Sequence, residues 1–208
     1  MSEIVRLTQK YRSQAIAVLV ETFNDYPAMR ECFLHHAADE QEYQRWLSLF
    51  MGLIFDEPFY LDGPLVGIVK NETLVAVMCC WKPGMNLDEK TWPEQLQQTY
   101  ATWVNAVGEE GIRKLELYSE TSDQHQPSGP HYFVDCIGVL DNHRGNGYAK
   151  SLLQYCCYLS NSDPGSNGVA LETEAARNVE FYRQLGYELK GESDIEGMQC
   201  WHFFKPND

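Results

Sequence analysis

The segment from Arg144 to Ala149 has the composition of an anion-binding turn. It reads Arg-Gly-Asn-Gly-Tyr-Ala, follows an apolar stretch that ends at Leu140, and precedes a stretch with helical periodicity. The N-terminus of a helix carries unpaired N–H groups and a positive partial charge, and glycines let the backbone approach an anion closely. No acidic residue occurs between Arg144 and Ser162. The segment is therefore expected to hold a phosphate or pyrophosphate group.

Other interpretations of this turn are weaker. Asn146-Gly147 is typical of a hairpin, but the residues beyond it repeat with helical rather than alternating periodicity. The glycines do not follow the Gly-x-Gly-x-x-Gly spacing, and Gly-Lys-Ser/Thr is absent, so neither a dinucleotide-binding fold nor a P-loop is indicated. A purely structural turn stays open on these residues alone.

The elements around the turn alternate between strands and helices. Hydrophobic periodicity predicts strands at 3–8, 65–69, 74–78, 131–140, 168–173, 187–190 and 199–205. Helical regions are expected around 15–23, 27–55, 88–120, 150–160 and 176–185, with a loop at 122–130. This order predicts an α/β (α+β) fold built on one sheet.

Composition restricts the classes of partner. The 208 residues suit one domain spanning 1–208, and the 16 basic and 30 acidic residues give a net charge of -14. Such a chain repels nucleic acid and anionic membranes and favours cationic partners such as amines. The seven cysteines are odd in number and have apolar neighbours, which is typical of reduced thiols in a cytoplasmic protein. Residues 1–6 lack a signal-peptide core, and no apolar run is long enough to span a membrane.

The turn and the segments on either side of it resemble the GNAT superfamily of N-acetyltransferases. Arg144 to Ala149 matches the family's Q/R-x-x-G-x-G/A motif. The resemblance extends over about 131–205 and includes its fourth strand ending Ile137-Gly138-Val139, its fifth strand at 168–173, and its helix motif Asn178-x-x-x-Tyr182-x-x-x-Gly186-Tyr187. Residues 125–132 are also similar to a subgroup that includes puromycin N-acetyltransferase. The resemblance implies a mixed, mostly antiparallel twisted sheet with splayed central strands.

This resemblance also implies an activity. Members of the superfamily move an acetyl group directly from acetyl-CoA to an amine, here a primary amine of a small molecule or an N-terminal amino group. Residues 131–208 would bind the cofactor and residues 1–130 the acceptor. The implied cofactor-binding residues are Ile137, Gly138, Val139, Arg144, Gly145, Asn146, Gly147, Tyr148, Ala149 and Asn178, and Tyr182 occupies the position of the general acid. A core aromatic is the alternative for Tyr182.

The general base has two candidates. Asp135 shares a strand face with Ile137 and Val139 by two-residue alternation, and a carboxylate inside an apolar strand is costly without a use or a partner. His131 has the same parity and is the second candidate. Some members of the family carry a glutamate two residues before position 135, where this chain has Phe133. A hydrogen-bonded structural carboxylate at Asp135 and an ordinary loop-end residue at His131 remain alternatives.

Competing functions also remain open. A non-catalytic CoA-binding module would keep the turn without needing Tyr182, whereas an acidic interaction protein would leave both unexplained. No metal ligation is expected, because the His35-His36 pair lacks matching ligands, and no cysteine has the surroundings of a nucleophile. Trp92, Tyr100 and Trp103 are expected in the core, with an acceptor pocket as the alternative. The expected assembly is a monomer or homodimer.

Overall fold

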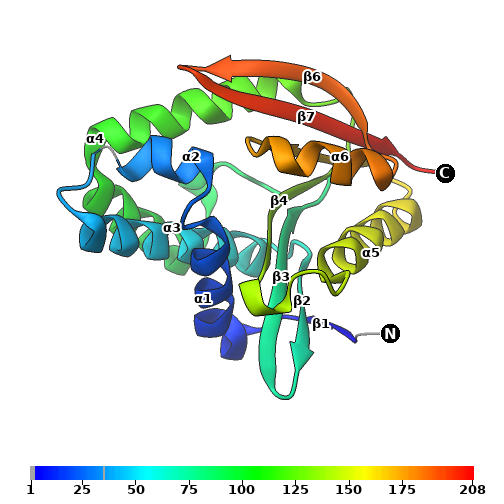
Figure 1. Cartoon of the computed structure of the whole chain (residues 1–208), viewed down its shortest axis with the longest axis horizontal. Coiled ribbons are helices and arrows are strands. Elements are labelled where there is room, and N and C mark those ends of the chain that lie inside the picture. The colour runs from blue at the N-terminus through cyan, green and yellow to red at the C-terminus, as the bar shows by residue number, and fades with distance from the viewer. Residues whose placement is uncertain (1–2, 35) are drawn as a thin grey trace.

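Seven strands form one sheet that runs through the molecule (Figure 1). The computed structural model describes residues 3–34 and 36–208. The sheet order is β1-β2-β3-β4-β5-β7-β6, and every neighbouring pair is antiparallel except β4 and β5. This arrangement confirms the mixed, mostly antiparallel sheet. The strands are β1 (Ile4–Arg6), β2 (Leu65–Lys70), β3 (Thr73–Trp81), β4 (Tyr132–Val139), β5 (Gly168–Thr173), β6 (Glu188–Ile195) and β7 (Met198–Pro206).

The two central strands separate halfway along their length. β4 pairs with β5 only from Tyr132 to Val134, whereas it stays paired with β3 as far as Val139. In the described chain, residues 135–139 of β4 therefore have no strand partner on the β5 side. This separation confirms the expected splay and opens one edge of β4 in the middle of the sheet.

Helices cover both faces of the sheet (Figure 1). One hydrophobic cluster contains residues of α1, α3 and α4 against β3, and the other contains residues of α5 and α6 against the opposite face. Strand alternation supplies both clusters, since Val77 and Cys79 face the first and Met78 and Cys80 the second. The helices are α1 (Arg12–Phe23), α2 (Pro27–Met29), α3 (Glu40–Tyr60), α4 (Glu94–His125), α5 (Tyr148–Ser162) and α6 (Ala176–Gln184).

Two predicted helical regions have different bounds in the structure. The region expected at 27–55 consists of α2, a π-helical turn at Arg30–Leu34 and α3, whose N-terminus is capped by Asp39 through a hydrogen bond from the N–H of Glu42. The loop expected at 122–130 was wrong at its start, because α4 continues to His125. Its last turns are held by the side chain of Ser122, which is buried and donates a hydrogen bond to Glu172.

The last two strands are longer than their apolar residues indicated. β6 and β7 form a hairpin joined at Glu196 and Gly197, which have φ values of 52° and 93°. These values are typical of a two-residue turn that matches the twist of antiparallel strands. The sequence analysis placed the first of these two strands at 187–190, and residues 191–194 beyond it contain no apolar side chain. β6 is an edge strand whose alternate residues face solvent, so it does not need an apolar face there.

Short 3₁₀ turns connect several elements, at Gln9–Tyr11, Glu89–Thr91 and Asp141–His143. None of the described helices has both the length and the apolar character needed to cross a membrane. All seven cysteines are free, and all but Cys157 are buried, as expected. Of the His35-His36 pair, His35 lies outside the described residues.

Candidate active site

A cavity of about 480 Å³ lies where β4 and β5 separate. Its walls come from α1, α3, α4, α6 and the two strands, together with Tyr26 and the start of α2. The cavity brings together seven of the residues singled out in the sequence, namely Asp135, Ile137, Val139, Arg144, Ala149, Asn178 and Tyr182. Residues that precede the glycine-rich turn in the sequence and residues that follow it thus lie together at the gap in the sheet.

The open edge of β4 presents main-chain groups to this cavity. The N–H of Leu140 donates to the carbonyl oxygen of Val75 at 3.0 Å, so Leu140 faces β3. Because strand residues alternate in the direction of their hydrogen bonds, Gly138 also faces β3, whereas Ile137 and Val139 face the β5 side. An extended ligand can add to such an edge as an extra strand would. Ile137 and Val139 therefore present their main-chain groups to the open side of β4.

Gly138 has a packing role. A Cβ atom built at this position would lie 2.8 Å from Oγ1 of Thr22 and 3.2 Å from Cδ2 of Leu19, both in α1. A larger residue would push α1 away from the sheet. Gly138 does not line the cavity, and we assign it to the close approach of α1 and β4.

The glycine-rich turn leads directly into α5. Gly145 and Gly147 have φ values of 78° and 76°, in the left-handed region that favours glycine, and the space where their Cβ atoms would lie is open. No side chain caps α5, and its first turn contains no acidic residue. The first N–H groups of the helix are thus available to an anion.

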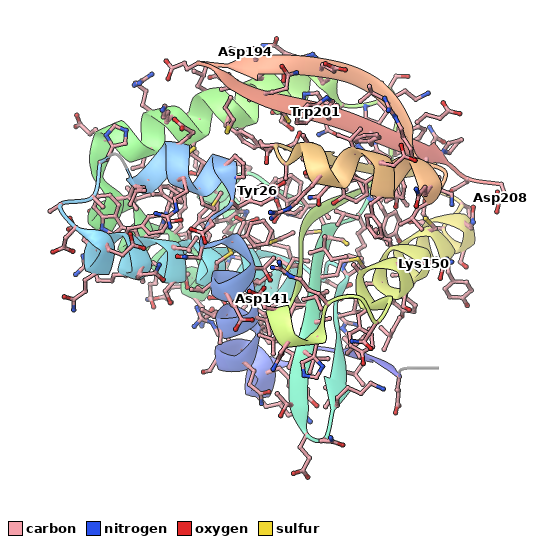
Figure 2. All side chains as sticks on the ribbon, in the orientation of Figure 1. Tyr26, Asp141, Lys150, Asp194, Trp201 and Asp208 are labelled. Atoms are coloured by element: carbon pink, nitrogen blue, oxygen red, sulfur yellow. The ribbon has the colours of Figure 1, made fainter. Side chains whose placement is uncertain are left out.

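Arg144 supplies a positive charge beside this turn. Its Nη2 atom lies 2.6 Å from Oδ1 of Asp141, which is labelled at the end of β4 in Figure 2. Asn146 stabilises the turn by donating a hydrogen bond to the carbonyl oxygen of His143 at 3.0 Å. Arg144 and Ala149 line the cavity, whereas Gly145, Asn146 and Gly147 are exposed at its outer end next to Tyr148. The turn is thus open to a ligand from solvent.

Tyr182 stands in the wall of the cavity with its ring fixed by neighbours. It is 6% exposed, and its ring centroid lies 6.1 Å from that of Tyr187 and 5.6 Å from that of Phe203. Burial raises the pKa of its hydroxyl well above the ordinary value, and the charge of Glu174 adds to the effect. The phenol therefore carries its proton at neutral pH and can donate it.

Asn178 lies one turn before Tyr182 on α6 and faces the same cavity. Its Nδ2 donates to Oγ1 of Thr173 at 3.1 Å. The same Thr173 oxygen is 2.7 Å from the hydroxyl of Tyr26, which is labelled in Figure 2 just before α2. Tyr26 also accepts a hydrogen bond from the N–H of Glu174 at 3.2 Å. These bonds tie α6 to β5 and to the N-terminal helices.

Asp135 lines the cavity together with Glu172 and Glu174. Its Oδ2 atom is buried and has no hydrogen-bond partner among the described residues. Burial and, to a smaller extent, the nearby charge of Glu172 together raise the pKa of Asp135 to about 7. A carboxyl group with this pKa can accept a proton near neutral pH, as a general base must.

His131 lies outside the cavity, in the loop before β4. Its Nδ1 atom is 2.8 Å from the carbonyl oxygen of Gly129, and its Nε2 atom is 3.0 Å from Oε1 of Gln126. Both ring nitrogens thus have loop partners, and His131 is not brought together with Tyr182. Alternation along the strand predicted that His131 shares a face with Asp135. However, β4 begins only at Tyr132, so the alternation does not extend to His131. Asp135 is the remaining candidate for the base.

Sequence reasoning missed a buried polar cluster behind Asp135. The Tyr118 hydroxyl lies 2.6 Å from Oε1 of Glu172 and 2.7 Å from Oε1 of Glu174. One phenol proton cannot be donated to both oxygens, so one of the two carboxyl groups must hold a proton. Burial raises the pKa of Glu174, which favours this residue as the protonated partner. The thiol of Cys200 also donates to Glu174, at 3.1 Å.

Glu172 has further donors in the same cluster. Its Oε2 atom accepts from Ser122 at 2.5 Å and is 3.2 Å from Nδ1 of His202. Ligand atoms of Glu172, Cys200 and His202 lie within 4.8 Å of one another, a grouping that could hold a metal ion. The sequence did not indicate this group, because its members come from two strands separated by a helix and a hairpin. Arg177, which also lines the cavity, was missed because it lies outside any motif.

The chain was compared with known protein families and structures. The model of the family described as "Acetyltransferase (GNAT) family" matches residues 26–187. A structure from Corynebacterium glutamicum, described as histone acetyltransferase HPA2 and related acetyltransferase, has a TM-score of 0.70 and 20% identity and covers 100% of this chain and 98% of its own.

Two further structures are similar at low identity. Arylalkylamine N-acetyltransferase 2 from Aedes aegypti has a TM-score of 0.64 and 14% identity, with 99% of each chain covered. The apo form of an agmatine N-acetyltransferase variant has a TM-score of 0.63 and 13% identity, with 98% of each chain covered. At these identities the structures support the fold alone, while the family model extends over most of the sequence and both sides of the sheet gap. The chain belongs to the GNAT family of acetyltransferases.

Proposed function

We propose that this chain transfers an acetyl group from acetyl-CoA directly to a primary amine of a small molecule or to an N-terminal amino group. The observation that carries the proposal is that the phenol of Tyr182 and the carboxyl group of Asp135 line one cavity at the place where the edge of β4 is open. The cavity leads to a turn suited to an anion. The cavity with Tyr182 and Asp135 is thus continuous with the turn that would bind the cofactor.

The residues present fit acetyl-CoA. The N–H groups of 145–149 would receive the pyrophosphate, since the positive φ of Gly145 and Gly147 leaves their outer side free of side-chain atoms. Arg144 would add its charge, and the main chain of Ile137 and Val139 would pair with the extended arm. Asn178 would contribute its side chain from the opposite wall of the cavity.

Tyr182 and Asp135 would handle the protons of the transfer. The carboxylate of Asp135 takes one proton from the ammonium form of the acceptor, which frees a nitrogen lone pair. That nitrogen, which still carries two protons, forms a bond to the acetyl carbon while the bond between carbon and sulfur breaks, and it then gives up one of these two protons to water. Tyr182 donates its phenolic proton to the departing thiolate. The protonated carboxyl of Asp135 and the ionised phenol of Tyr182 then return to their starting states by exchange with solvent.

The remaining parts of the proposal concern location and assembly. Seven free thiols support a reducing cytoplasmic location. The proposed state is a monomer or homodimer without a resident metal. The Glu172, Cys200 and His202 atoms already have hydrogen-bond partners within the protein, which supports a structural role for that cluster.

The function is tested by thiol release from acetyl-CoA with a panel of amines. We expect turnover by the wild-type protein and a decrease in kcat of about 10²- to 10⁴-fold in Tyr182→Phe, because the variant keeps the ring but loses the proton donor. Affinity for acetyl-CoA should be unchanged. Tyr187→Phe is the matched control, since it makes the same chemical change beside Tyr182 but outside the cavity. Tight acetyl-CoA binding without thiol release for any amine would favour a non-catalytic binding module.

A further inference from the structure

A second cavity, of about 420 Å³, adjoins the first. It lies between α3, α4, β3 and β4. Asp135 and Glu172 line both cavities, so the two meet at the proposed base. A molecule in the second cavity would reach Asp135 from the side opposite to the glycine-rich turn. Its volume is in the range of sites for small organic ligands.

The charged groups around the second cavity are all acidic. Among the described residues, the lining includes the carboxyl groups of Glu57, Glu89, Glu116, Asp123, Asp135 and Glu172 and contains no lysine or arginine. Several aromatic rings complete the wall, among them Trp81 and Phe133, which stack with centroids 5.3 Å apart. Aromatic faces attract cations and cover the methylene groups between them. The surface is thus complementary to an organic cation.

Glu57 is the second buried carboxyl group of this cavity. It is 8% exposed, and none of the groups that act on its pKa is a cation. Burial, with a smaller contribution from the charge of Asp135, raises its pKa to about 8. The indole N–H of Trp81 is close enough to lower this pKa, although it makes no hydrogen bond of ordinary geometry. The preceding residue differs, since Asp56 is paired with Arg12 at 2.8 Å.

Two carboxyl groups without a cation therefore share one cavity. A buried carboxylate is costly unless it is paired, and its neighbour makes the cost larger. A ligand with one ammonium group would compensate Asp135 or Glu57 but not both. A ligand with two ammonium groups joined by methylenes would compensate both and place its chain against Trp81. The unpartnered Oδ2 atom of Asp135 marks where one nitrogen would bind.

We infer that the acceptor is a diamine, with the reacting amino group at Asp135 and the distal ammonium group at Glu57. This inference rests on the proposed function, because it names the acceptor class of the same site. The distal ammonium keeps its charge throughout, so Glu57 positions the substrate and takes no part in proton transfer. The proton balance at Asp135 and Tyr182 is unchanged.

The test compares α,ω-diamines from diaminopropane to diaminohexane with alkylamines of the same carbon number. Affinity is measured by calorimetric titration of the full chain at mildly alkaline pH, and thiol release from acetyl-CoA is followed in the same preparations. We expect at least one diamine to bind about tenfold more tightly than its matched alkylamine, which corresponds to about 1.4 kcal/mol. This preference should be lost in Glu57→Gln and kept in Glu120→Gln, which removes an exposed carboxylate of α4 outside the cavity.

A conservative variant separates a positioning role from a structural one. Glu57→Asp retains the charge on a shorter side chain, so the preferred diamine should become longer. Equal affinity for diamines and alkylamines at every length would overturn the inference, and so would a diamine preference that survives in Glu57→Gln. In either case, turnover of alkylamines would still support the proposed transferase activity. If diamines bind with the expected preference but acetyl-CoA neither binds nor reacts, the proposed function fails and the diamine site stands.

Discussion

The two sides of β4 differ in their charge and in the parts of the chain that form them. On the cofactor side, the turn from Arg144 to Ala149 is exposed, contiguous in sequence and free of acidic residues. On the other side, Glu57, Trp81 and Asp135 come from three separate elements and form a buried, acidic wall. The turn presents main-chain N–H groups, whereas the acidic wall presents side chains. A binding surface made of main-chain groups depends on few particular side chains. A binding surface made of side chains depends on their types, and these types determine which acceptor fits.

The largest effect predicted for the acidic side is that of Asp135→Asn. An amide cannot accept the proton of the acceptor, so kcat/KM should fall by about a hundredfold or more. In the wild-type protein the rate should rise with pH through about 7, where Asp135 loses its proton. The measurement is the pH dependence of kcat/KM for both proteins, and the variant should lack this rise. An unchanged profile in Asp135→Asn would assign the base to another group.

A smaller effect is predicted for Arg144→Ala on the cofactor side. Arg144 is half-exposed and already paired with Asp141, so its charge is partly screened. We expect the Kd for acetyl-CoA to rise roughly three- to tenfold, with a smaller difference at high salt. Titration calorimetry at two salt concentrations measures this. Arg45→Ala provides the matched control, because it removes an exposed charge of α3 away from both cavities.

The smallest effect concerns the stability of the acidic side. The folded protein raises the pKa of Glu57 from 4.5 to about 8, so the folded state binds this proton more tightly than the unfolded chain. Stability contributed by the neutral carboxyl is present at low pH and is lost as the pH rises through this window. Glu57→Gln should therefore raise Tm by about 2–4 °C above pH 8, for a gain of roughly 1 kcal/mol, and less in acid. Thermal unfolding at both pH values measures the difference, and a uniform gain would contradict the ionisation argument.

The sequence indicated the local structure around the glycine-rich turn more fully than it indicated the acidic cavity. The turn at 144–149 and the motif from Asn178 to Tyr187 are local patterns, so their residue types and spacing determine their geometry. The strand parity that placed Asp135 with Ile137 and Val139 was also local. Local patterns failed at His131, because alternation holds only inside the strand.

The missed residues depend on contacts distant in sequence. Tyr118 meets Glu172 across 54 residues, and Tyr26 meets Thr173 across 147. Trp92, Tyr100 and Trp103 were expected in the core, and they also line the second cavity, which only the packing of α3 against α4 creates. Glu57 carried no signal, since a glutamate near a helix end is usually solvated. Its burial follows from tertiary packing and could not be derived from periodicity.

Calorimetric titration with acetyl-CoA tests most directly whether the glycine-rich turn binds the cofactor, as we propose. Gly147→Trp places a large side chain on the outer face of the turn, and Gly197→Trp is the control, because Gly197 also has a positive φ and open space around it but lies in the β6–β7 hairpin. We predict micromolar binding by the wild-type protein and Gly197→Trp, corresponding to about -8 kcal/mol, and its loss in Gly147→Trp. Equal binding by all three folded proteins, or no binding by the wild type, would contradict the account.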